Sequence, residues 1–450
     1  MLINFKVRNF LSFENEECFS MVAGKGRAFA NRVYQDKHNK ILKFASLFGA
    51  NGSGKSNFVK AIGFSKNYIA FGNPRAFIDQ YYKLNPGCKD MPTLFEYKIK
   101  IADKVYTYGF EAVLSHNELI SEWLISNNVS TDKIIFKYNR ENKGVSFGNY
   151  FKNEELKHRL EIYGEGMNPD GNTLFLRMIN ENKQLFLDYD EASVLQDVFY
   201  WFVFSLKVKM PDTHMSDYDY FMSPKNMDQI IKIFDAFDLS ISSYEFTKAS
   251  KDEIALKVPK EIFNDFLANI EKALFENDDE EQDNEHHVMF GINDDFYIAK
   301  AEGNNIIFQT LKFYHGRYRE TPFSMQEESD GTKKIFKLLE ILFQEDQDVT
   351  YVVDEIDRCL HPLLTYNFIS AFLEKANKNN CQLIATTHES ILLDFNLLRK
   401  DEIWIVSQKD GSSYLESMGR KEIRADKKLS KTFLLGEIGV PKIKYNMYKG

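Results

Sequence analysis

The chain has 450 residues, of which 44% are hydrophobic and 27% are charged, so two or three soluble globular domains are expected. Its net charge of −9 gives no support for nucleic-acid binding, although a local basic patch could still provide it. Four widely spaced cysteines without a C-x-x-C pair favour reduced thiols in a cytoplasmic protein, and no apolar run of about 18 residues predicts a membrane span.

The first 150 residues have the pattern of strands around one helix. Residues 1–22 alternate as two short strands and lack the apolar stretch of a signal peptide. Residues 41–48 form an apolar run typical of a buried strand, and a helix opens at residues 56–62. Further strands are expected at 94–101, 105–110, 119–126 and 134–138.

The segment between this strand and this helix reads Phe-Gly-Ala-Asn-Gly-Ser-Gly-Lys-Ser and fits the phosphate-binding pattern G-x-x-x-x-G-K-[ST]. Its glycines allow tight turns that bring backbone N–H groups close to an anion, and the helix dipole adds to the attraction. Lys55 can reach the outer phosphates, and the Ser56 hydroxyl can hold Mg²⁺. The alternative, a glycine-rich turn with an incidental lysine, is disfavoured by the flanking strand and helix. The expected nucleotide-binding residues here are Gly49, Asn51, Gly52, Ser53, Gly54, Lys55, Ser56 and Asn57.

Residues 151–304 change to a helical spacing of apolar residues, which predicts a mainly helical insert. Within it, residues 276–285 hold seven carboxylates in ten positions and predict an exposed, flexible loop. His286 and His287 follow these acids without metal-ligand spacing, so a solvated loop is favoured over a metal site.

From about residue 305 the chain returns to alternating strands and helices. This alternation predicts a mainly parallel sheet, and therefore an α/β fold in which the lobes 1–150 and 305–450 flank the insert in the sequence. The expected strands are 306–313, 349–353, 381–386, 402–406 and 413–416, and the expected helices are 333–343 and 362–375.

Residues 350–355, Thr-Tyr-Val-Val-Asp-Glu, form an apolar strand that ends in two acids, which is the Walker B pattern. Asp354 is placed to steady Mg²⁺, directly or through water, and Glu355 to orient and polarise the attacking water. A strand that simply ends in a polar turn would look similar. The P-loop upstream and Leu360-His361-Pro362 downstream favour the nucleotide site.

Three segments of the last third together resemble the Walker B, D-loop and H-loop of ABC-type ATPases. More narrowly, they are similar to the SMC-like branch and its small bacterial relatives in phage defence, the abortive-infection and RloA-type ATPases grouped as family-15 AAA ATPases. The opening at residues 3–13 and the segment Glu328-Ser329-Asp330-Gly331-Thr332 resemble the first motif and the signature of that group. The resemblance covers residues 1–150 and 305–450, and the middle matches loosely. The three segments are Asp354-Glu355-Ile356-Asp357, Leu360-His361-Pro362 and Ile384-Ala385-Thr386-Thr387-His388.

The resemblance implies a P-loop ABC-type ATPase head that uses ATP and Mg²⁺, with Glu355 and His388 as catalytic residues. Ser329 and Gly331 would contact the γ-phosphate bound to another subunit, and Asp357 would cross the interface. This implies a head-to-tail homodimer, or a larger oligomer built from it. Gln80 is a Q-loop candidate for Mg²⁺ on its position alone.

Departures from the family pattern narrow the expectation. The signature is Ser-Asp-Gly-Thr, which argues against a transporter subunit, and no long heptad stretch predicts a coiled-coil arm. Only 62 residues follow His388, too few for a TOPRIM nuclease domain.

Three functions remain open from the sequence. The first is a switch or scaffold ATPase of antiphage defence that controls a separately encoded effector of nuclease type. The second is an SMC-like ATPase that acts directly on DNA, and the third is a binding module that keeps nucleotide for structure only. Intact Glu355 and His388 argue against the third. The basic candidates for a DNA groove, for which a solvated face is the simpler interpretation, are Lys152, Lys157, Arg159, Lys207 and Lys209.

Overall fold

The structure is a computed structural model that divides into two compact units, and each unit is described by itself. Unit 1 comprises Met1–Pro211, Asp346–Asp357 and Phe368–Gly450, and unit 2 comprises Asp212–Glu345 and Arg358–Asn367. The structure describes residues 1–72, 78–128, 131–142, 144–165, 167, 172–181, 189–212, 219–275, 287–303, 305–316, 321–343, 348–376, 378–421 and 429–435.

A six-stranded sheet in unit 1 carries the predicted alternation of strands and helices. Its neighbours pair in parallel from β11 to β19, and only β19 and β20 are antiparallel, so the mainly parallel sheet is confirmed. The carboxyl ends of β5, β17 and β18 therefore meet at one edge, the usual place for ligands in such sheets. The order is β11 (Leu206–Lys209), β17 (Thr350–Val353), β18 (Gln382–Thr387), β5 (Phe44–Phe48), β19 (Ile403–Lys409) and β20 (Ser412–Ser417).

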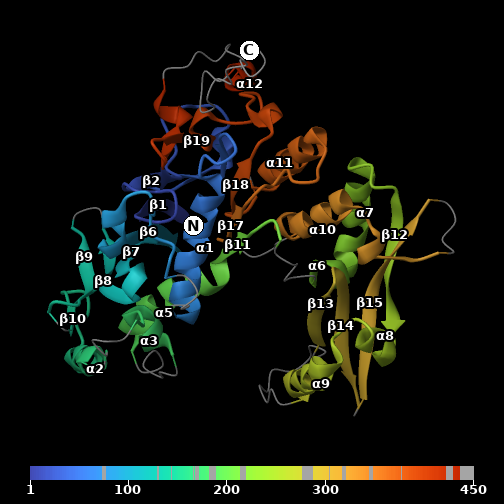
Figure 1. Ribbon diagram of the computed structural model, residues 1–450, viewed down its shortest axis with the longest axis horizontal. Coiled ribbons are helices and arrows are strands. Elements are labelled where there is room, and N and C mark those ends of the chain that lie inside the picture. Colours follow the sequence, from blue (N-terminus) through green and yellow to red (C-terminus); the bar gives the residue numbers. More distant parts are fainter. Residues whose placement is uncertain are drawn as a thin grey trace. The chain divides into compact units, whose positions relative to one another are not determined.

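A second, antiparallel sheet of seven strands lies in the same unit and is coloured blue to teal in Figure 1. Alternation along β1 buries Phe5 and Val7. The half-buried Lys6 pairs with Glu96 of the adjacent β6, and the half-buried Arg8 pairs with Glu111 of β7, one strand further along the sheet. The order is β10 (Gly144–Phe147), β9 (Lys133–Asn139), β8 (Glu118–Asn127), β7 (Lys104–Val113), β6 (Thr93–Ile101), β1 (Leu2–Arg8) and β2 (Glu17–Ser20). A small sheet pairs β3 (Val33–Gln35) with β4 (Lys40–Leu42).

Helix α1 (Lys55–Phe71) joins the two sheets through one hydrophobic core. The ring of Phe58 on α1 lies 5.7 Å from that of Phe5 and 5.1 Å from that of Phe19, and Phe19 in turn lies 4.9 Å from Trp404 of β19. A helix with apolar residues on several faces has to be buried on several faces, so α1 is fixed rigidly. Within the described residues, unit 1 also contains α2 (Glu154–Glu165), α3 (Phe175–Asn180), α5 (Ser193–Tyr200) and α12 (Leu429–Leu434).

Unit 2 is an antiparallel sheet with helices on it. Helix α9 (Lys260–Phe275) packs on an apolar cluster that includes Tyr297 and Phe308. In α10 (Asp330–Phe343), the ring centre of Phe336 lies 4.6 Å from the ring centre of Phe313. The strand order is β12 (Ile241–Ala249), β15 (Asn305–His315), β14 (Asp295–Glu302) and β13 (His287–Ile292), with β16 (Phe323–Ser324) paired to β15. The remaining helices are α6 (Asp219–Met222), α7 (Pro224–Ala236) and α8 (Lys251–Ala255), and α11 (Pro362–Ala376) begins in unit 2 and ends in unit 1.

The expected domain boundaries at residues 151 and 304 are wrong. Residues 151–211 belong to unit 1, because Phe175 of α3 and Phe202 after α5 enter its core. β15 belongs to unit 2, because it pairs with β12 and β14 along its length. The expected helical insert is therefore a mixed unit of helices and strands. The helical spacing of its apolar residues did not reveal the strands. The acidic segment 276–285 and His286 lie outside the described residues, and His287 begins β13.

Among the helices that the structure describes, none is long and apolar enough to cross a membrane.

Candidate nucleotide-binding site

The loop between β5 and α1 has the backbone that its glycines were expected to allow. Gly52 has φ 76° and Gly54 has φ 108°, in the left-handed region that strains residues with a Cβ. At Gly49, a Cβ would lie 2.3 Å from the carbonyl oxygen of Val406 on β19. Gly52 and Gly54 are therefore needed for the turn of the loop, and Gly49 is needed because the backbone of β19 comes close to it.

The start of α1 leaves hydrogen-bond donors unsatisfied. Gly54 is its N-cap, and no side chain within the described part of the chain caps it. The helical ladder begins with the Phe58 N–H, which donates to the Gly54 carbonyl. N–H groups of the first turn, together with the helix dipole, can therefore bind an anion.

A polar pocket of about 270 Å³ opens beside this loop. It gathers the ends of three strands of the parallel sheet, because Glu355 follows β17 and His388 follows β18. The structure thus brings together most of the residues expected from the sequence. The lining residues are Asn51, Gly52, Ser53, Gly54, Lys55, Ser56, Asn57, Glu355 and His388.

Lys55 is the cation of the pocket and is 5% exposed. Its Nζ donates to the carbonyl oxygens of Gly49 at 2.9 Å and Ala50 at 3.0 Å. Burial lowers the pKa of Lys55 to about 8, against the opposing effect of Asp354, Asp357 and Glu355. The ammonium group is therefore poorly solvated and surrounded by carboxylates, a setting in which a phosphate would be a strong additional partner.

Asp354 and Glu355 are held by Thr386 of β18. The Thr386 hydroxyl donates to Asp354 Oδ1 at 2.5 Å and accepts from the Glu355 N–H at 2.8 Å. Asp354 is 2% exposed, and Glu355 has φ 47°, an unusual conformation for a residue with a side chain. The two acids are thus fixed at the end of a fully buried strand.

His388 and Asp357 meet at the same edge of the sheet. The His388 backbone N–H donates to Asp357 Oδ2 at 3.1 Å, and the buried Asp357 Oδ1 has no partner among the described residues. Burial and the nearby Lys55 lower the pKa of His388, although Asp357, Glu355 and Asp354 act in the opposite direction. A neutral imidazole can still donate one hydrogen bond to an anion.

Two serines hold the phosphate-binding loop from outside and were given no role from the sequence. The Ser413 hydroxyl of β20 donates to the Ser53 carbonyl at 2.7 Å and lies 2.8 Å from the Ser12 hydroxyl. Asn57 Nδ2 donates to Ser12 Oγ at 2.8 Å. Ser12 lies in the expected opening motif and could have been singled out, whereas nothing in the sequence marks Ser413.

The signature residues belong to unit 2. Ser329 is exposed and precedes α10, and its Oγ accepts from the Thr332 N–H at 3.1 Å, which makes it an N-cap. A Cβ at Gly331 would lie 2.9 Å from the Cys359 carbonyl oxygen. Gln80 lies in unit 1, where its carbonyl oxygen accepts from the Leu11 N–H at 2.7 Å, and it is not among the residues that line the pocket. Its role in binding Mg²⁺ stays a prediction.

The donor set suits Mg²⁺. Ser56 supplies a hydroxyl and Asp354 a carboxylate, and Mg²⁺ is usually bound through one or two such oxygens together with phosphate oxygens and water. Among the described residues, no group of three or more His, Cys, Asp or Glu side chains forms a separate metal cage. A metal here would therefore be held jointly with a nucleotide.

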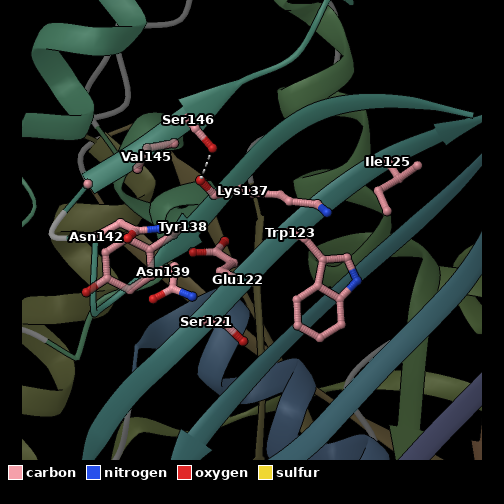
Figure 2. Close-up of a pocket in the computed structure, with 11 residues that line it drawn as sticks. Ser121, Glu122, Trp123, Ile125, Lys137, Tyr138, Asn139, Asn142, Val145 and Ser146 are labelled. Carbon is pink, nitrogen blue, oxygen red and sulfur yellow. Dashed lines mark hydrogen bonds between the residues drawn. The ribbon is translucent and has the colours of Figure 1, made fainter.

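A larger hollow of about 500 Å³ lies on β8, β9 and β10 and contains none of these motif residues (Figure 2). The buried Glu122 lines it and accepts hydrogen bonds from the Tyr108 hydroxyl and from the N–H groups of Phe175 and Leu176. Burial raises the pKa of Glu122 to about 7. Both carboxylate oxygens are occupied, so this group ties α3 to the sheet.

Comparison with known proteins gives a family and a set of remote structural relatives. The family described as "AAA domain, putative AbiEii toxin, Type IV TA system" matches residues 44–163 and 224–394, more than half of the chain. A search of curated proteins finds no match.

Three of the similar solved structures are SMC heads, each with low sequence identity. A head bound to the C-winged helix domain of ScpA has 15% identity and a TM-score of 0.38, covering 92% of this chain and 97% of that chain. The SMC head domain from Thermotoga maritima has 13% identity and a TM-score of 0.33, covering 92% and 98%. A head with an extended coiled coil, bound to the C-terminal domain of ScpA derived from Pyrococcus furiosus, has 16% identity and a TM-score of 0.32, covering 97% and 98%.

Proposed function

The chain belongs to the family described as "AAA domain, putative AbiEii toxin, Type IV TA system", and we propose that it is an ABC-type switch that binds and hydrolyses ATP. One observation carries this proposal. The pocket beside α1 combines a phosphate-binding loop and its lysine with an acid and a histidine from two neighbouring strand ends. Phosphoryl transfer needs positioning and charge compensation, and these are the groups that provide both.

Each side chain has a defined task in this proposal. The N–H groups of the loop and of the first turn of α1, together with the Lys55 ammonium, would bind the phosphates. Ser56 and Asp354 would hold Mg²⁺, which would neutralise charge on the phosphate oxygens. Glu355 orients and polarises the attacking water. The neutral His388 donates a hydrogen bond to the γ-phosphate, where negative charge develops.

The pocket is open, so a second copy of the chain is proposed to complete it. Ser329 and Gly331 of that copy would contact the γ-phosphate, and Asp357 would lie at the interface, in a two-fold head-to-tail dimer or a larger oligomer. The exposure of Ser329 and the unsatisfied Oδ1 of Asp357 support this arrangement.

The biological role is proposed from the family. The family description names a putative toxin of a toxin–antitoxin system, which supports a role in a cytoplasmic defence system. In this proposal, the ATP-bound state controls a separately encoded effector of nuclease type. The SMC-like alternative, direct action on DNA, requires a basic groove. Among the candidate residues, Arg159 already pairs with Glu155 at 3.1 Å, and Lys207 lies over the Tyr351 ring at 5.6 Å. The defence switch is therefore preferred.

The first test is the rate of ATP hydrolysis by the purified chain, with and without double-stranded DNA at low salt, where phosphate contacts are strongest. Slow hydrolysis that DNA leaves unchanged supports the switch, and strong stimulation by DNA supports the alternative. The role in defence is tested by plating phage on a strain that carries the native locus with either the wild-type chain or Lys55→Ala. Equal plaque counts would contradict it.

A further inference from the structure

We propose that Thr386 is a positioning residue for hydrolysis, which fixes Asp354 and Glu355 through a single hydroxyl group. This inference rests on the proposed ATPase function and assigns a role to a residue that is not among those lining the pocket. The threonine stands two positions before His388, at the carboxyl end of β18.

The contacts of Thr386 reach three consecutive residues. Its hydroxyl donates to Asp354 Oδ1 at 2.5 Å and accepts from the Glu355 N–H at 2.8 Å, and its carbonyl oxygen accepts from the Ile356 N–H at 3.1 Å. The parallel pairing of β17 with β18, in which Val353 is opposite Ala385, sets this register. The segment that follows β17 is therefore tied to the next strand residue by residue.

The hydroxyl both donates and accepts a hydrogen bond. A threonine has one O–H to donate and lone pairs to accept, and here both functions have partners. Thr386 is 1% exposed and Asp354 is 2% exposed, so loss of the hydroxyl would take a hydrogen-bond donor from a buried carboxylate and an acceptor from the half-buried Glu355 N–H. The hydroxyl of the neighbouring Thr387 has a different partner, because it accepts from the Glu389 N–H at 3.0 Å.

The hydrogen bond to Glu355 also supports an unusual backbone conformation. Glu355 has φ 47°, in the left-handed region, which a residue with a Cβ adopts only when its surroundings hold it there. This conformation directs Glu355 to the pocket that it shares with Lys55 and His388. Without the Thr386 hydroxyl, we expect the backbone to relax and the carboxylate to lose its place beside the γ-phosphate.

The bond to Asp354 orients the other acid. Because the hydroxyl donates to Oδ1, it fixes the orientation of the carboxylate group that would bind Mg²⁺. Groups that orient a metal ligand in this way change metal affinity or activity by about 10- to 100-fold when they are removed. The same hydroxyl thus influences metal binding and the attacking water together.

The test compares the parent with Thr386→Val, which keeps the shape and removes the hydroxyl, and with Thr386→Ser, which keeps the hydroxyl. The matched control is Thr365→Val, because Thr365 is fully buried and its hydroxyl has no partner among the described residues. Four quantities are measured: kcat, KM, the Mg²⁺ concentration that gives half of the nucleotide-induced rise in Tm, and the nucleotide affinity in EDTA.

For Thr386→Val we expect a loss of kcat of about 10- to 100-fold and about a tenfold higher Mg²⁺ requirement. Its nucleotide affinity in EDTA should stay within about threefold of the parent, because the phosphate-binding loop is untouched. Thr386→Ser should recover most of both losses, and Thr365→Val should match the parent. A merely structural role would lower Tm without moving the Mg²⁺ requirement.

Parental kcat and Mg²⁺ requirement in Thr386→Val would overturn the inference. If Thr386→Val fails to fold, Thr386→Ala is measured in its place, again beside Thr386→Ser. A lower kcat with a higher Mg²⁺ requirement would then support the inference, and parental values of both would overturn it. Should the parent hydrolyse no ATP, the proposed function fails, while the Mg²⁺-dependent Tm rise still shows whether Thr386 orients Asp354.

Discussion

The helix starts at Gly54 in unit 1 and at Ser329 in unit 2 are built in opposite ways. α1 follows two left-handed glycines, and no side chain among the described residues caps it. α10 follows a serine whose own hydroxyl accepts from the Thr332 N–H. The first start leaves its donors for a ligand, and the second has already satisfied one of them.

The surroundings of the two helix starts differ as well. At α1 the unsatisfied donors stand beside a buried lysine and beside an acid and a histidine from neighbouring strands, in one pocket. At α10 the start is exposed and self-capped. We therefore expect α1 to bind the nucleotide by itself, and α10 to act only on a nucleotide that is already bound.

The largest effect should come from the lysine of the α1 site. Lys55→Ala should lower ATP affinity on the order of 100-fold, because the carboxylates nearby would then face the phosphates without the cation between them. A titration with a fluorescent nucleotide measures this. Lys60→Ala is the control, since Lys60 is exposed on the same helix, and it should bind like the parent. Retained affinity in Lys55→Ala would mean that the phosphates bind elsewhere.

The α10 start is tested by a pair of variants that both preserve the cap. Asn and Asp are equally good N-caps, but only Asp adds a negative charge. Ser329→Asp should lower turnover by about tenfold through repulsion of the γ-phosphate, whereas Ser329→Asn should lower it much less. Both should bind nucleotide like the parent. Equal turnover in the two variants would contradict the proposal that Ser329 lies close to the γ-phosphate.

A smaller effect is expected from the serine that supports the α1 loop. Ser413→Ala removes the hydrogen bond to the buried Ser53 carbonyl, which is worth about 1 kcal/mol, so ATP affinity should fall by about fivefold. Ser412→Ala is the control on the same strand, because its hydroxyl accepts from the Glu14 N–H instead. If Ser413→Ala and Ser412→Ala bind ATP with equal affinity, Ser413 does not stabilise the phosphate-binding loop.

The smallest effect on nucleotide binding is expected at the hollow on β8–β10. Burial raises the pKa of Glu122 from its ordinary value of 4.5 to about 7, so the folded state holds a proton that the unfolded state has released. The stability from this group is present below about pH 4.5 and is lost as the pH rises through 7, a change of about 3 kcal/mol. Glu122→Gln should lack this component in unfolding measured from pH 4.5 to 8, and its ATP affinity should equal the parent's. An unchanged pH profile would contradict the assignment.

The sequence predicted the parts of the site whose chemistry is local. The phosphate-binding loop and the acids after β17 are contiguous motifs, and the alternation of strands and helices was enough to place both at the carboxyl ends of parallel strands. Ser413 could not be predicted, because it reaches Ser53 across 360 residues through the register of β19 and β20. Of the sheet of unit 2, only the strand expected at 306–313, which is β15, was predicted. β12 was missed because it stands between the helices α7 and α8, whose periodicity dominates that part of the sequence.

The most direct test of the account is ATP binding and hydrolysis measured side by side on the parent and on Glu355→Gln. Gln keeps the size of the side chain but cannot polarise the attacking water as a carboxylate does. We expect the variant to bind ATP with Mg²⁺ within about threefold of the parent, to hydrolyse it on the order of 100-fold more slowly and to accumulate as a nucleotide-bound dimer. Hydrolysis at the parental rate would show that Glu355 does not activate the water.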